Sequence, residues 1–150
     1  MIKLLLSLIA AMVITTQAQP ALGVYDYAQT FTAAKNMSYE QIWDWWDTCD
    51  YPGWLLPQLR AIEKRGRTPI VCVEPWPISS ITQNKADLLS DIIYGKYDNV
   101  IRTIAADIKK FNAPVIVRWG QEMEATARYP WACKQPSAYI PAFQHVSAGF

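Results

Sequence analysis

The sequence predicts an α/β protein of the (β/α)8 TIM-barrel type, represented by its first four βα units. Three observations lead to this prediction: strand-like and helix-like segments alternate, the strand-like segments are apolar, and polar residues follow several of them. Alternation with continuously apolar strands indicates a parallel sheet whose connections are helices. A complete barrel normally takes ~250 residues. This chain has 150 residues, so we expect about half of one.

Residues 1–18 are expected to be a cleavable secretory signal peptide. After one early lysine comes an apolar run, Leu4–Ile14, and the small residues Thr16 and Ala18 fit a cleavage site. The run is shorter than the ~20 residues of a membrane-spanning helix. Residues 19–150 are therefore predicted to form a secreted or periplasmic domain that has no membrane contact after cleavage.

The first half of this domain is predicted to contain two strands and a helix. Leu22–Tyr25 is a short apolar strand. Gln41–Trp46 could begin a helix, because a Ser-x-x-Gln capping box introduces it, but its isoleucine and tryptophans favour a strand. Pro57–Arg65 is expected to be a helix, with proline at its first position and Gly66 just past its end.

The second half continues the alternation. Thr68–Val73 has the continuous β-branched character of a strand buried on both faces. Asp87–Tyr94 is expected to be a short helix, and Asp98 is expected to cap a longer helix with apolar residues at helical spacing. Pro114–Val117 is predicted to be the fourth strand, and Ser137–Val146 the last helix.

The composition excludes several classes of protein. Hydrophobic residues make up 51% of the chain and the formal net charge is +1, which argues for a globular fold and against nucleic-acid binding. One histidine and the lack of a Cys-x-x-Cys motif lead us to expect no metal site, and no cofactor is expected. Cys72 is expected in the core, whereas Cys49 and Cys133 could pair.

Acidic residues follow three of the predicted strands: Asp26, Glu74 and Glu122. Barrels place their chemistry at the carboxyl ends of strands. A doubly wound sheet shares this rule, but it usually has a Gly-rich first turn, and Tyr25-Asp26-Tyr27 is unlike one. Asp26 could simply cap its turn. Glu122 is the strongest candidate, because apolar surroundings at a strand end would suit a carboxyl that acts as general acid.

Glu74, Trp76 and Arg118 could complete a sugar site. Glu74 beside Trp76 would place a carboxylate on sugar hydroxyls and an indole on the ring face. Arg118 is expected to point inward and to hydrogen-bond a carboxylate or a sugar hydroxyl. The alternative is structural, with Arg118 forming an ion pair with Glu122 or with Glu74.

The segment Val117–Glu124, followed by Arg128–Trp131, resembles glycoside hydrolase family 26, the β-mannanase family of clan A. The family signature is Arg-x-x-His-Glu-Met-Asn followed by Tyr/Phe-Pro-Trp, and the resemblance spans roughly Ala21–Val146 in the same motif order. It implies retaining hydrolysis of a β-linked polysaccharide or oligosaccharide, with Glu122 as acid/base. The implied nucleophile is a Glu on a seventh strand, to which no residue of this chain corresponds. The expected substrate-binding residues are Tyr25, Glu74, Trp76, Arg118, Gln121, Tyr129 and Trp131.

Three departures from the signature leave the sugar open. Gln121 replaces the family's His, Glu124 replaces Asn, and Arg128 replaces Trp, so a mannan, an acidic polysaccharide or a substituted one is conceivable. Two other functions remain: a module that binds glycan without cleaving it, through Trp76 and Trp131, or an inactive truncated product. An open half-barrel would also expose strand edges and self-associate.

Overall fold

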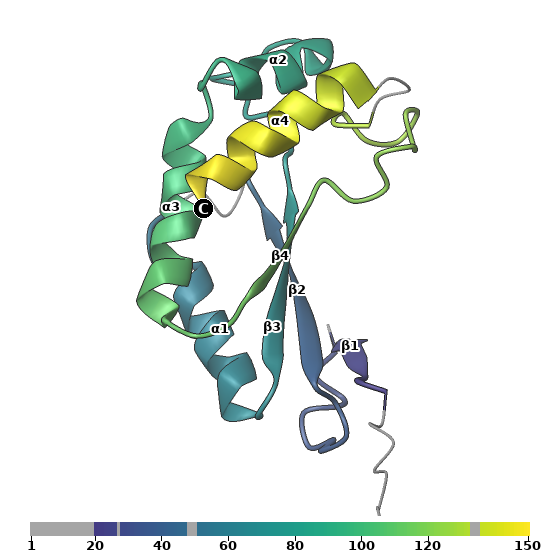
Figure 1. Ribbon diagram of the computed structural model, residues 1–150, viewed down its shortest axis with the longest axis vertical. Helices are drawn as coiled ribbons and strands as arrows, with labels where there is room; N and C mark the ends of the chain where they lie inside the picture. The colour runs from purple at the N-terminus through teal and green to yellow at the C-terminus, as the bar shows by residue number, and fades with distance from the viewer. Residues whose placement is uncertain (1–19, 27, 48–50, 133–135) are drawn as a thin grey trace, which may run out of the picture.

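The computed structural model describes residues 20–26, 28–47, 51–132 and 136–150. The expected signal peptide, residues 1–18, and the expected pairing of Cys49 with Cys133 lie outside these ranges. From β2 onward, strands and helical segments alternate along the chain as predicted (Figure 1). In chain order the elements are β1 (Gly23–Tyr25), β2 (Tyr39–Trp45), α1 (Leu55–Lys64), β3 (Thr68–Glu74), the short 3-10 helix η1 (Lys85–Asp87), α2 (Leu88–Ile93), α3 (Asp98–Phe111), β4 (Ile116–Trp119) and α4 (Pro136–Gly149).

Four strands form one parallel sheet in the order β1-β2-β3-β4, so strands that follow one another in the chain also pair. The connection from β2 to β3 contains α1, and the connection from β3 to β4 contains α2 and α3. The predicted α/β class and parallel sheet are therefore confirmed. The connection from β1 to β2 differs, because its described residues form turns instead of a helix.

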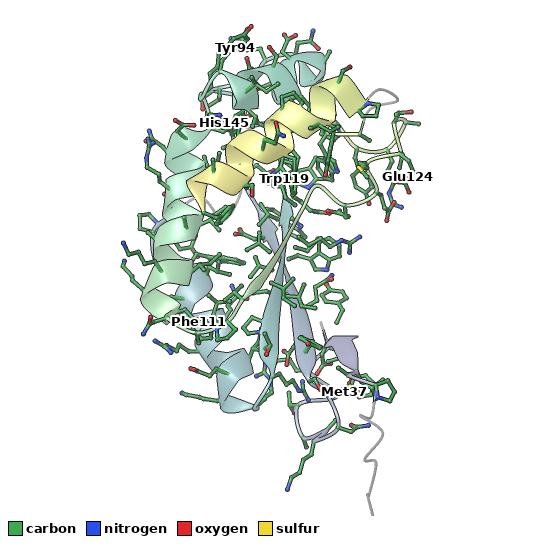
Figure 2. All side chains as sticks on the ribbon, viewed as in Figure 1. Met37, Tyr94, Phe111, Trp119, Glu124 and His145 are labelled. Carbon is green, nitrogen blue, oxygen red and sulfur yellow. The ribbon has the colours of Figure 1, made fainter. Side chains whose placement is uncertain are left out.

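The helices cover one face of the sheet (Figure 1). Val71 and Val73 of β3 are fully buried against them, and Trp119 of β4 lies beside α4 (Figure 2). No helix among the described residues covers the opposite face, which we call the open face. Ile116 and Arg118 are exposed there. One side of the sheet is thus a packed core, and the other, which no described helix covers, is exposed at Ile116 and Arg118 but buried at Cys72 and Glu74.

The ambiguous segment after residue 38 is a strand, as favoured from its residue types. β2 pairs with β3 along its whole length, from Tyr39 opposite Thr68 to Trp45 opposite Glu74. Isoleucine and tryptophan side chains suit such a pleated, half-buried surface. Long pairing with a central strand therefore outweighs the local capping signal.

The predicted start of the first helix at Pro57 is wrong, because α1 begins at Leu55. The N–H groups of Gly53, Leu55 and Leu56 donate to the carboxylate of Asp107 on α3, at 3.2, 3.0 and 3.2 Å. A negative charge that accepts from free N–H groups stabilises a helix N-terminus. This charge comes from a residue about fifty positions away, so the local sequence gives no sign of it.

Asp98 does not cap α3 as predicted. Tyr97 holds the capping position, without a side-chain hydrogen bond, and Asp98 is the first helical residue. Its Oδ1 instead lies 2.8 Å from Nε2 of His145 on α4. The last helix is confirmed, and it continues past its predicted end at Val146 to Gly149. A tertiary contact between two helices has replaced the expected local cap.

A hydrogen-bond network fixes the segment that follows β3. The hydroxyl of Thr82 donates to Asp91 (2.7 Å) and accepts from the hydroxyl of Tyr97 (2.9 Å). The Tyr97 hydroxyl in turn accepts from the N–H of Ile78 (3.1 Å), and Lys96 pairs with Asp91 at 2.7 Å. The network anchors the loop that carries Trp76, a predicted site residue.

Acid should weaken this network, because the hydrogen bond from Lys96 lowers the pKa of Asp91 below its ordinary value of 3.8. A lowered folded-state pKa stabilises the fold above that ordinary value, and the stabilisation is lost as the pH falls through the lowered one. We expect Asp91→Asn to cost roughly 0.5–1 kcal/mol at pH 7, a modest figure since half-exposed Lys96 is screened by solvent. Urea unfolding of both proteins at pH 7 and pH 3 measures this. If the difference in unfolding free energy between the wild type and Asp91→Asn is as large at pH 3 as at pH 7, the prediction is contradicted.

Candidate active site

The chain turns sharply where β4 ends. Gly120 has a φ of 57°, in the left-handed region, and its N–H donates to the Val73 carbonyl at 3.0 Å. The Tyr139 hydroxyl on α4 lies 3.0 Å from the carbonyl oxygens of both Trp119 and Gly120. A Cβ at residue 120 would lie 3.2 Å from both Trp131 and Tyr139. Only glycine suits this position, and the turn brings the next residues to the end of the sheet.

Glu122 follows this turn and also adopts a left-handed backbone, with a φ of 51°. Residues other than glycine rarely take this conformation, and such strain concentrates at functional sites. The side chain is 45% exposed, and its Oε2 lies 3.6 Å from Nη1 of Arg128. The water-excluded surroundings expected for Glu122 are therefore not found here. Its ion pair among the described residues is with Arg128 rather than with Arg118.

Glu74 and Gln121 meet at the carboxyl ends of β3 and β4. Both are buried, at 8% and 5% exposure, and Nε2 of Gln121 donates to Oε1 of Glu74. The indole N–H of Trp76 donates to the other oxygen, Oε2, at 3.0 Å. The Trp131 indole N–H donates to the Gln121 carbonyl at 2.7 Å. Each oxygen of Glu74 thus has one N–H donor, and the Gln121 side chain is fixed in one orientation.

Cys72, two residues before Glu74 on β3, contacts the Gln121 side chain of this pair. It is fully buried, as predicted for a core cysteine, and its Sγ lies 3.5 Å from Oε1 of Gln121. Burial raises the pKa of the Cys72 thiol to about 12, an effect that Arg118 opposes and Glu74 reinforces. The sulfur therefore stays protonated at neutral pH and donates to the amide oxygen, and it is a poor nucleophile.

Three aromatic rings pack beside the carboxylate of Glu74. Trp76 meets Trp131 edge-on (centroids 5.0 Å apart) and Tyr129 at 6.0 Å, while Tyr129 and Trp131 stack at 4.6 Å. The Arg128 guanidinium lies 5.0 Å from the Tyr129 ring centre. Trp76 and Tyr129 are partly exposed, whereas Trp131 is completely buried. Trp131 is therefore placed to hold the loop, and the other two rings can meet a ligand.

The two remaining predicted residues lie outside this cluster. Tyr25 is opposite Gln41, whereas Glu74 is opposite Trp45, so four residues, or ~13 Å, separate their levels along the sheet. Arg118 is opposite Cys72 on the open face and is exposed. The structure thus gathers Glu74, Trp76, Gln121, Tyr129 and Trp131, with Glu122 at the rim, but not Tyr25 or Arg118.

The cluster offers a buried carboxylate that accepts hydrogen bonds, an exposed carboxyl on strained backbone, and two ring faces. This combination can bind hydroxyl groups and transfer a proton at the rim. Within the described ranges, no group of three or more His, Cys, Asp or Glu side chains is placed to hold a metal ion. Glu124, next along the loop, is exposed on its outer side (Figure 2).

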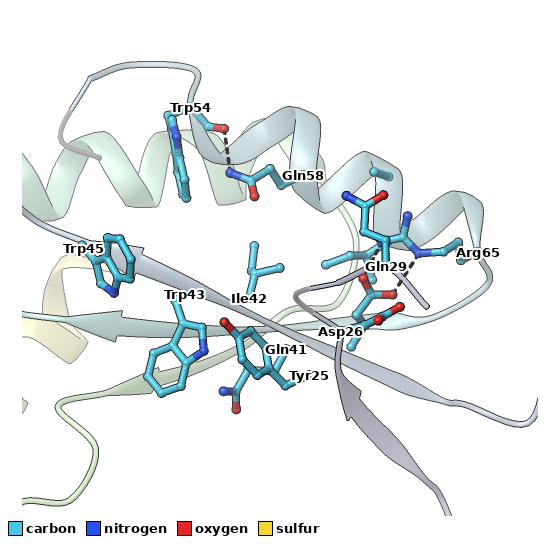
Figure 3. Close-up of a pocket in the computed structure, with 13 residues that line it drawn as sticks. Tyr25, Asp26, Gln29, Gln41, Ile42, Trp43, Trp45, Trp54, Gln58 and Arg65 are labelled. Atoms are coloured by element: carbon cyan, nitrogen blue, oxygen red, sulfur yellow. Dashed lines mark hydrogen bonds and ion pairs between the residues drawn. The ribbon is translucent and has the colours of Figure 1, made fainter. Parts of the chain in front are cut away.

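The sequence reasoning missed a second group of side chains. Trp43, Trp45 and Trp54 line a groove between β2 and α1, together with three glutamines (Figure 3). The available signal was the spacing of Trp43 and Trp45, since residues two apart on a strand point to the same face.

Among the described residues, none of the helices has the length and apolar character needed to cross a membrane.

Comparison with known proteins leaves the geometry as the main guide to function. No protein-family model matches the chain, and no curated protein matches it.

Proposed function

We propose that the chain is the N-terminal half of a (β/α)8-barrel retaining glycoside hydrolase similar to family 26, exported from the cell, with Glu122 as acid/base. The observation that carries the proposal is the backbone of Glu122, which has a left-handed φ of 51° three residues after β4 ends and directly follows Gln121, the residue that contacts Glu74. Strained backbone at residues other than glycine is concentrated at functional sites, which argues for a role in chemistry.

In this proposal each part of the cluster has one task. The carboxylate of Glu74, with Gln121 holding it in place, accepts hydrogen bonds from sugar hydroxyls. Trp76 and Tyr129 lie against a sugar ring, and Glu122 gives its proton to the leaving oxygen. Arg128, 3.6 Å from Glu122, stabilises the carboxylate that this transfer produces. The polysaccharide is the expected partner.

An added nucleophile makes the proposal testable, because the family resemblance assigns the nucleophile to no residue of this chain. Azide would form a bond to the anomeric carbon as the bond to the leaving oxygen breaks, while Glu122 protonates that oxygen. The product is a glycosyl azide of inverted configuration, detected by mass spectrometry and NMR. Aryl β-mannosides, β-glucosides and β-xylosides are the substrates.

Glu122→Gln should slow the reaction by about 10²–10⁴ for a phenyl leaving group, which needs a proton. A dinitrophenyl leaving group needs none, so its rate should change little. Glu124→Gln is the matched control, since it removes an exposed carboxylate from the same loop. The proposal fails if the wild-type protein forms no glycosyl azide. It also fails if Glu122→Gln leaves the rates with both the phenyl and the dinitrophenyl leaving groups unchanged.

A module that binds glycan without cleaving it is the second candidate. The partly exposed rings of Trp76 and Tyr129 favour it, because aromatic faces provide contact area without any chemistry. An oxidation measurement beside the azide reaction separates the two functions. If a saccharide protects these rings from oxidation but no glycosyl azide forms, the binding module is supported.

A further inference from the structure

A groove of about 570 Å³ lies between β2 and α1, apart from the candidate active site. It exists because β1 pairs with β2 only as far as Tyr25 opposite Gln41, so the edge of β2 from Ile42 to Trp45 extends beyond β1. The turns that connect β1 to β2 also leave one flank of α1 uncovered. The volume is within the roughly 300–1,000 Å³ of ligand-binding pockets.

The walls of the groove combine aromatic rings with amide groups (Figure 3). Trp54 and Gln58 lie at the N-terminal end of α1, whereas Trp43 and Trp45 lie on the face of β2 that points away from α1, so the groove wraps around the free edge of the strand. Gln58 is held by a 3.5 Å hydrogen bond to the carbonyl of Trp54. Gln29 and Gln41 add two further amides. Such walls offer apolar faces together with both hydrogen-bond donors and acceptors.

The charged groups of the groove already have partners. Both oxygens of Glu40 accept from Arg65, and the Oε2 contact is 2.9 Å. The carboxylate of Asp26 accepts from the N–H groups of Thr30 (2.7 Å) and Phe31 (2.8 Å), so Asp26 caps its turn. A charged ligand would have to compete with these contacts. The groove therefore suits an uncharged ligand.

Strain marks one end of the groove. Gln29 has a φ of 53°, and its N–H donates to the carbonyl of Asp26 at 3.0 Å. Only a few per cent of residues other than glycine adopt this backbone conformation, and it concentrates where ligands bind. Gln29 lies at one end of the groove, and Trp45 and Trp54 lie at the other (Figure 3).

We propose that this groove binds a neutral oligosaccharide segment, independently of the reaction proposed above. A sugar chain is uncharged, has hydroxyls for the three glutamine amides and has apolar ring faces for the tryptophans. Its extended form matches a groove that runs along α1. The ligand class therefore follows from three properties of the walls: aromatic faces, amide groups, and charged groups that already have hydrogen-bond partners.

Affinity electrophoresis of the full chain tests this proposal, with soluble glucomannan, xylan and mixed-linkage β-glucan as neutral probes. Anionic polygalacturonate is the charged comparison. The wild-type protein should be retarded by at least one neutral polymer. Ala61→Leu fills the groove from α1 with a good helix former and should weaken this retardation at least about tenfold. Gln58→Ala should weaken it as well, should Ala61→Leu fail to fold.

Lys64→Ala is the matched control, because Lys64 is exposed on the same helix and does not line the groove. It should bind as the wild type does. Trp76→Ala tests the other site, and weakened binding in the folded groove variants supports the proposal whatever Trp76→Ala does. Retardation by polygalacturonate alone overturns the proposal. So does an absence of retardation, or a folded Ala61→Leu protein that binds as tightly as the wild type.

Discussion

Replacing Arg67 by alanine should lower the free energy of unfolding by about 3 kcal/mol, because it breaks a buried ion pair. The Arg67 side chain has no exposed surface, and its Nη1 donates to Oε2 of Glu40 at 2.6 Å. Its Nη2 donates to the carbonyls of Phe31 and Ala34. The variant would leave Glu40, itself 7% exposed, with Arg65 as its remaining arginine partner.

Urea unfolding at pH 7 measures the loss, and we expect the midpoint of thermal unfolding to fall by roughly 10 °C. Arg65→Ala is the matched control. It removes the other arginine from the same carboxylate, but the Arg65 side chain is 23% exposed and water can replace it, so we expect about 1 kcal/mol. Equal losses in the two variants would contradict the burial argument. A loss below about 0.5 kcal/mol in Arg67→Ala would contradict the ion pair's importance.

The strands could be predicted from the sequence because their signal is local. Val71, Cys72 and Val73 are consecutive apolar residues, and all three are fully buried in the central strand β3. The helix starts could not be predicted in the same way. The position of Leu55 depends on Asp107, and Asp98 is engaged by His145, so both ends are determined by residues about fifty positions away.

The candidate site could be predicted in part, because two of its residues follow strands that the sequence predicts. The rule that parallel strands end at one edge of the sheet places Glu74 near Gln121, and the structure brings them into contact. The surroundings of Glu122 followed from no such rule. Its exposure depends on the path of the loop after Gly120, which is held by Tyr139 of α4, outside the motif, and by Trp131 at the end of the motif. The retaining reaction and its substrate stay predictions.

Glu122→Gly should be more stable than Glu122→Ala by about 1 kcal/mol, although both remove the same carboxylate. At a backbone φ of 51° the Cβ of an alanine comes too close to the carbonyl oxygen, which destabilises the folded state. Glycine has no Cβ and avoids this contact. Both variants should also lose proton transfer to a phenyl leaving group, by about 10²–10⁴. Urea unfolding and the azide reaction measure the two effects on the same proteins.

Asn112 provides the control for strain without chemistry. It has nearly the same φ, 54°, at the C-terminal cap of α3, where asparagine tolerates the left-handed conformation. Asn112→Gly should therefore change the stability little, whereas Glu122→Gly should raise it above the wild type. A stabilised but inactive Glu122→Gly protein would mean that the glutamate is retained at a cost to the fold, as expected of a catalytic group. If the glycine variants at both positions behave alike, residue 122 stores no special strain, and the main support for Glu122 as acid/base is lost.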